Sequence, residues 1–267
     1  MILLEPIDLA LAALLVVASA ALAWALRLGI SRSLLIAGTR MVIQLLLVGL
    51  VLKAVFDRAE LAWIVLIAGV MLIVAGYEAT ARQKRPMAGL WSMGIGVGAM
   101  FISAFTVTVL SLTVILGPSP WYTPQYAIPL LGMLLGNTMT GVALSLDRLT
   151  QTLWERRAVV EARLMLGHPW SEAVTDIRRD CMRAGMIPTL NAMAAAGIVS
   201  LPGMMTGQIL AGTPPVEAVK YQILIMCLIM GATTAGTALA VQLACRRLVD
   251  GRERLRLDRL RVQGRTR

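Results

Sequence analysis

The sequence predicts an all-α protein that crosses a membrane about seven times. Hydrophobic residues make up 58% of the 267 residues, and the mean hydropathy is +0.75, both well above the values of soluble domains. Charged residues are only 15% of the chain and cluster between long apolar runs. Because about 20 apolar residues suffice to cross a bilayer as a helix, these runs favour a polytopic membrane protein. We expect a single transmembrane domain over residues 1–267.

Seven apolar runs are long enough to be spanning helices. Their ranges are 7–26, 34–56, 61–78, 91–116, 126–146, 186–211 and 219–245. We interpret the first as a retained span rather than a cleaved signal peptide, because Glu5 and Asp8, not basic residues, precede it. An odd number of spans places the two termini on opposite sides of the membrane.

The basic residues predict which side each end occupies. Nearly all arginines fall in one set of loops and in the tail 246–267, whereas the other set holds only Lys53 and Arg58, with Lys220 at a span border. Cytoplasmic loops are the ones enriched in Lys and Arg, so the N-terminus is expected outside and the C-terminus in the cytoplasm. The net charge of +10 therefore indicates membrane topology rather than nucleic-acid binding. We expect the arginine-rich tail to rest on anionic lipid headgroups.

A long polar segment, residues 147–185, separates the fifth and sixth predicted spans. It contains the stretch EARLMLGHPWSEAVTDIRRDCMRAGMIP, whose pattern predicts two short helices along the membrane, joined by a turn near Gly167. An amphipathic connector without further function would also fit this pattern.

The same segment resembles the coupling loop of ABC-transporter permeases, whose pattern is Glu-Ala-Ala, three residues, Gly, nine residues and Ile. Glu161, Ala162, Gly167 and Ile177 match it, while Arg163 replaces the second Ala. Arg179-Asp180 stands where importers have Leu-Pro. In such permeases this loop sits in a groove of the ATPase and transmits its closure to the spans.

Three further stretches resemble the FetB family of ABC permeases, which is associated with iron export in bacteria and, in plant relatives, with aluminium tolerance. These are RSLLIAGTRMVIQLLLVG, GYEATARQKRP and the long run from Met186 to Val241. The resemblance implies a bacterial inner-membrane exporter subunit for iron or another metal. It also implies that this chain performs no chemistry and holds no cofactor.

The partners follow from the resemblance together with the lack of a nucleotide motif. The chain contains no Gly-x-x-x-x-Gly-Lys-Ser/Thr phosphate loop, so ATP and Mg²⁺ are expected on a separate ATPase subunit. A permease of half the usual size needs a second copy, most simply as a twofold homodimer.

The stretch GIVSLPGMMTGQILAG predicts a break inside the sixth span. Pro202 cannot donate to a helix ladder, and in lipid a freed backbone group must be satisfied by protein or water. Gly203 and Gly207 form a Gly-x-x-x-Gly pair that would permit close helix approach. A kinked packing helix explains this stretch, and so does a hinge that lines the translocation path with Met204, Met205 and Gln208.

Other polar residues inside the spans need partners. We expect an ion pair between Arg40 and Glu78, acting as a structural latch or as part of the path. Asn137 and Asn191 either line a central cavity or form hydrogen bonds between helices. The lone His168 is assigned no metal, and the metal ligands stay unknown, since thioethers such as Met204 and Met205 prefer softer ions than iron.

One alternative is a secondary transporter of a small solute driven by an ion gradient. It would require a carboxylate within the membrane, for which only Glu78 is placed, and it would not require a coupling segment. An intramembrane enzyme is a second alternative, but the chain has neither Gly-x-Ser-x-Gly nor His-Glu-x-x-His.

Overall fold

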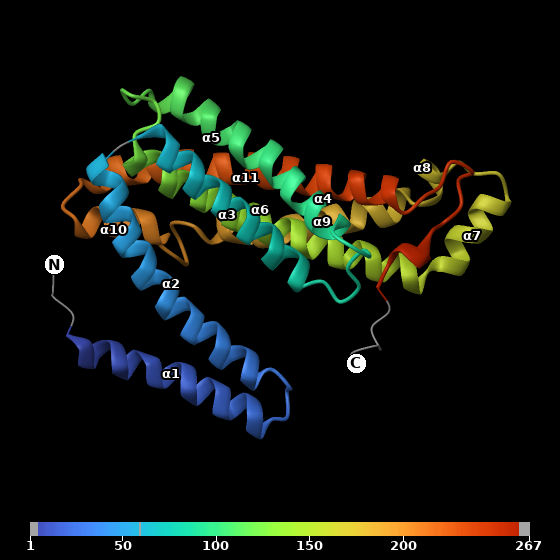
Figure 1. The fold of residues 1–267 in the computed structure, drawn as a ribbon, viewed down its shortest axis with the longest axis horizontal. Coiled ribbons are helices and arrows are strands. Elements are labelled where there is room, and N and C mark those ends of the chain that lie inside the picture. Colours follow the sequence, from blue (N-terminus) through green and yellow to red (C-terminus); the bar gives the residue numbers. More distant parts are fainter. Residues whose placement is uncertain (1–4, 59, 262–267) are drawn as a thin grey trace. The chain divides into compact units, whose positions relative to one another are not determined.

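The computed structural model describes residues 5–58 and 60–261 and divides the chain into two compact units, residues 1–60 and 61–267. Within the described ranges the regular structure is helical, apart from isolated bridges. Six helical stretches are long and apolar enough to cross a membrane (Figure 1). The predicted fold class, an all-α polytopic membrane protein, is therefore confirmed.

The first unit is a helical hairpin of α1 (Pro6–Ala25) and α2 (Ser31–Arg58). The turn between them uses Arg27 and Gly29, both at positive φ. The two helices approach closely at Gly38, where an added Cβ would lie 2.9 Å from Cγ1 of Val16. Most apolar side chains of this unit are exposed, as expected of helices that face lipid.

The second unit is a bundle in which α6 (Pro124–Glu155) is central. It packs against α3 (Leu61–Ala81), α9 (Thr175–Ala195) and α11 (Pro215–Arg247). The stretch Trp91–Leu116 runs through α4 (Trp91–Met100), the π-helix η1 (Phe101–Phe105), α5 (Thr106–Leu110) and the π-helix η2 (Ser111–Leu116). Short helices α7 (Arg157–Met165), α8 (Trp170–Ala173) and α10 (Gly203–Leu210) complete the bundle, and η3 (Leu257–Arg259) lies in the tail.

Small residues let the central helices meet backbone to backbone. An added Cβ at Gly185 of α9 would lie 2.6 Å from the carbonyl oxygen of Gly141 on α6. At Gly236 of α11 it would lie 2.7 Å from Oγ of Ser103. Close packing of small residues is the usual way in which helices associate where lipid removes the hydrophobic driving force.

The sixth predicted span, 186–211, is not one helix but two. It divides into the second half of α9 and the whole of α10, joined by residues 196–202. α10 lies at the end of the bundle away from α7 and α8 (Figure 1). The chain thus runs along the bundle through α9 and then α10. The physical reason is the predicted breaker: Pro202 forms the N-cap of α10, and Gly197 adopts a φ of +83° that ends the preceding helix.

Candidate functional site

The predicted coupling segment forms a helix–turn–helix at one end of the second unit, beyond the end of α6 (Figure 1). Gly167 ends α7 with a φ of +87°, and its N–H donates to the carbonyl of Leu164 at 3.0 Å. The next N–H, that of His168, donates to the carbonyl of Arg163 at 3.2 Å. A left-handed residue that closes a helix in this way favours glycine, which explains Gly167 in physical terms.

The structure separates the four motif residues into two groups. Glu161, Ala162 and Gly167 are exposed, whereas Ile177 on α9 is buried, 5% exposed. Ile177 therefore anchors the segment through its buried side chain and does not contribute to the exposed surface of the segment. The tip of the turn carries Met165 and Leu166, which are 83% and 79% exposed. Such large exposed apolar side chains, next to charged ones, are typical of protein-binding surfaces.

Arg163, the residue that departs from the importer pattern, braces the turn. Its guanidinium donates to the carbonyl of Ala173 at 3.2 Å and to Oδ2 of Asp176 at 3.3 Å. It thus joins α7 to the start of α9 across the turn. The sequence alone did not predict this role, because the partners lie ten and thirteen residues away.

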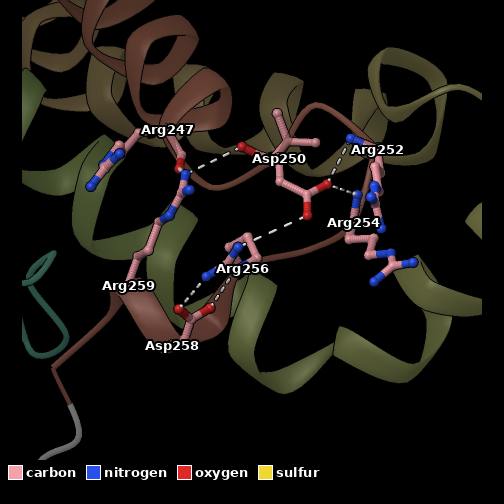
Figure 2. Close-up of polar contacts among 8 residues, drawn as sticks. Arg247, Asp250, Arg252, Arg254, Arg256, Asp258 and Arg259 are labelled. Atoms are coloured by element: carbon pink, nitrogen blue, oxygen red, sulfur yellow. Dashed lines mark hydrogen bonds and ion pairs between the residues drawn. The ribbon is translucent and has the colours of Figure 1, made fainter.

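The described part of the tail folds back onto the second unit. Residues 249–255 form a hairpin in which Oδ1 of Asp250 accepts the backbone N–H of Arg252 and of Arg254, each at 2.9 Å (Figure 2). These hydrogen bonds, first that from Arg254, lower the pKa of Asp250 below its ordinary value. The side chain of Arg256 forms an ion pair with Asp258 at 2.8 Å. Its backbone N–H donates a hydrogen bond to the carbonyl of Leu248.

The tail then joins the loop between α3 and α4. The N–H of Ala88 donates to the carbonyl of Arg259 at 2.7 Å, and the N–H of Arg261 donates to that of Pro86 at 2.9 Å. Met87 and Leu260 are both buried there. The tail up to Arg261 is thus an integral part of this end of the protein. The predicted contact of the tail with lipid stays a prediction, and residues 262–267 lie outside the described residues.

An open groove of about 670 Å³ runs between the coupling segment and the tail hairpin. Glu161, Gly167 and His168 line one wall, and Arg252 and Arg254 line the other. The two walls are linked where the N–H of Trp170 donates to Oε2 of Glu253 at 3.1 Å. Two segments whose linked residues are 83 positions apart thus form one surface.

A second, partly open pocket lies at the opposite end of the bundle, between α6, α10 and α11. It is a pocket of about 210 Å³ whose lining includes Met133, Met204, Gln208 and Tyr221. The side-chain oxygen Oε1 of Gln208 is buried and has no hydrogen-bond partner among the described residues. An acceptor left without a partner in an apolar pocket is costly unless a ligand or water donates to it.

Not all residues predicted for the path reach this pocket. Met205 is not among its lining residues. The amide of Asn137 donates to the carbonyl of Met133 on its own helix at 2.8 Å, and Asn191 is exposed on α9. Their predicted role in a path stays a prediction.

The close helix approach that Gly203 and Gly207 were expected to permit is not made within this chain on its own and stays a prediction. An added Cβ at either glycine would meet nothing within 4 Å. The motif only permits a close approach, and no described helix lies near enough to use it. An added Cβ would meet a neighbour closer than 3.0 Å at Gly38, Gly76, Gly141, Gly185 and Gly236, and none of these belongs to a Gly-x-x-x-Gly pair.

The Arg40–Glu78 ion pair stays a prediction, since Arg40 belongs to α2 in the first unit and Glu78 to α3 in the second. Among the residues that the structure describes, no three His, Cys, Asp or Glu side chains are grouped so as to hold a metal ion.

Comparison with known proteins gives consistent matches along the chain. The family described as "Uncharacterised protein family (UPF0014)" matches residues 6–249. UPF0014 membrane protein slr1647 of Synechocystis is 39% identical over 214 residues, 79% of this chain and 80% of its own. The probable iron export permease protein FetB of Escherichia coli is 33% identical over 259 residues, 95% of this chain and 96% of its own. UPF0014 membrane protein STAR2 of rice is 36% identical over 234 residues, covering 87% and 80%. No solved structure matches the chain.

Proposed function

Because this chain belongs to the UPF0014 family of membrane proteins, we propose that it is the transmembrane permease subunit of an ABC-type exporter. ATP and Mg²⁺ bind to a separate ATPase, so this chain performs no chemistry itself. Iron or another metal is the cargo, in keeping with the name of the relative from Escherichia coli. The protein resides in the bacterial inner membrane, with the N-terminus outside and the arginine-rich end in the cytoplasm.

The observation that carries this proposal is the exposed helix–turn–helix of α7 and α8. It projects from the end of the bundle that bears the arginine-rich loops, and its tip presents Met165 and Leu166 to the surroundings. Buried Ile177 and the bonds of Arg163 fix it to α9, so a push on the tip is passed to a helix that enters the bundle. A transporter driven by an ion gradient has no use for such a rigid lever.

The proposal includes a second copy of the chain. Asn191 is exposed on α9, and its side-chain amide forms no hydrogen bond with the described residues. An amide facing lipid is unfavourable, whereas an amide facing a second copy or a watery path between two copies is satisfied. A homodimer with α9 at its interface meets this requirement.

The complex can be tested by purifying this chain together with the ABC ATPase encoded next to it. We expect the wild-type complex to contain two copies of each subunit by native mass spectrometry. Glu161→Lys, which reverses an exposed charge on α7, should abolish co-purification while the melting temperature of the chain stays unchanged. Glu217→Lys, at an exposed position near the start of α11 and at the opposite end of the bundle, is the matched control for charge. Failure of the wild-type chain to bind the ATPase would favour the gradient-driven transporter instead.

The pocket between α6, α10 and α11 is proposed as part of the export path. Replacing Gln208 by Leu removes its buried acceptor oxygen at similar volume. Export of a hydrated metal ion, whose bound water would donate a hydrogen bond to that oxygen, should therefore slow by about tenfold, the effect of one lost bond to a buried group. The assay is iron efflux from proteoliposomes that contain the full complex. Gln125→Leu, at the rim of the same pocket, controls for lost polarity at its exposed edge. Unchanged efflux in the Gln208 variant would remove this pocket from the path.

A further inference from the structure

We propose that the tail hairpin 249–255 forms half of the surface that docks the ATPase, by binding an acidic segment of that partner. This inference rests on the proposed function, because it names a second contact for the same partner. The coupling motif ends at Ile177, and nothing in it concerns residues some eighty positions further along the chain.

The groove provides the first argument. Leu164 and Met165 of α7 and Leu255 of the hairpin give the groove an apolar part of its lining. Glu161 lies on the same wall as Gly167. A partner that seats itself against the coupling turn at this groove therefore meets the hairpin at the same time. Without the hairpin, the groove would keep only the wall that the coupling segment forms.

The charges of the hairpin provide the second argument. Arg252 and Arg254 are exposed. Their backbone N–H groups donate to the carboxylate of Asp250, and the carbonyl of Arg254 accepts the N–H of Asp250, but neither guanidinium forms a hydrogen bond with the described residues. Figure 2 shows the side chain of Arg254 extending away from that carboxylate. No carboxylate of the described residues forms an ion pair with either guanidinium, unlike Arg256, which Asp258 engages. Two guanidinium groups without an ion-pair partner, beside apolar lining residues, fit a partner segment that carries carboxylates next to an apolar side chain.

The rigidity of the hairpin provides the third argument. Asp250 closes it from inside, and Glu253, at a φ of +55°, accepts the N–H of Trp170 and so ties it to the start of α8. Arg259 donates to the carbonyls of Arg247 and Val249 and fixes its base to the end of α11. The two arginines are thereby presented in fixed positions relative to the coupling turn, which lowers the cost of ordering them on binding.

The experiment measures ATPase binding to the full chain in nanodiscs. Arg252→Glu combined with Arg254→Glu should weaken binding by about tenfold or more, and the salt dependence of binding should diminish. Asp250→Ala, which frees the hairpin but keeps both arginines, should weaken binding less. Arg32→Glu combined with Arg82→Glu changes the net charge equally, at exposed arginines outside the groove, and should leave affinity unchanged.

The outcomes separate this inference from the proposed function. If Glu161→Lys abolishes binding but the Arg252 and Arg254 variant binds like wild type, the permease assignment stands and the docking role of the hairpin is overturned. If the wild-type chain binds no ATPase, the proposed function itself fails. Discs of neutral lipid and discs with anionic lipid are compared in parallel. A defect seen only with anionic lipid would show that the arginines act through the membrane, which also overturns the inference.

Discussion

Replacing Gly185 by alanine should destabilise the folded protein by about 1–3 kcal/mol, even though alanine is the better helix former. The new methyl group would lie 2.6 Å from the carbonyl oxygen of Gly141, 2.9 Å from Cγ2 of Thr237 and 3.0 Å from Cβ of Ser145. Its nearest neighbour is backbone, which cannot rotate away, so α6 and α9 must separate. Gly185→Val should be more harmful still.

The measurement is the melting temperature of the purified chain in one detergent. Gly207→Ala is the matched control, since a Cβ at Gly207 meets nothing within 4 Å and the substitution favours the helical state. Equal melting temperatures for the Gly185 and Gly207 variants would show that α6 and α9 do not pack as closely as described.

Gly167→Pro should uncouple ATP hydrolysis from transport. Proline fixes φ near −65°, whereas Gly167 has a φ of +87° and donates its N–H to Leu164, so the substitution is incompatible with both features. The turn between α7 and α8 would then lose its shape. For an ordinary L-residue the left-handed conformation costs about 1–2 kcal/mol, roughly a tenfold loss in the population of the turn. Proline cannot adopt it at all.

Metal efflux and ATPase activity should be measured together in proteoliposomes containing the complex. Gly167→Asn should retain more efflux than Gly167→Ala, because asparagine tolerates the left-handed region better. Gly49→Ala, at a glycine of α2 with no positive φ and open space around it, should behave like wild type. Full efflux with Gly167→Pro would mean that the turn does not transmit the motion of the ATPase.

The membrane class and most spans could be predicted from the sequence, because lipid imposes strict demands on length and polarity. Six of the seven predicted ranges correspond to the spanning stretches of the structure. The break at Pro202 was also predicted, since a residue without an N–H interrupts any helix. The resemblance to the FetB family, identified from three stretches, is confirmed by the relatives.

The packing contacts could not be predicted in the same way. The sequence shows Gly203 and Gly207 in a recognised motif, yet within the chain close approaches occur at other glycines, among them Gly141, Gly185 and Gly236. The spacing of residues within one helix shows which face of the helix carries small residues. It does not show which other helix packs against that face. The same holds for Arg163, whose partners across the turn are set by how α7 and α9 meet.

The sequence by itself determined that this protein is a helical membrane protein with a polar segment between its fifth span and a broken sixth. These properties follow from local physics: the length of apolar runs, the effect of proline and glycine, and the placement of charge. Only the tertiary structure decided that the arginine-rich tail up to Arg261 folds against the α3–α4 loop and Trp170, and that Gln208 faces a pocket with Met133. Such contacts join residues far apart in the chain, so they depend on how the helices pack and not on any local pattern.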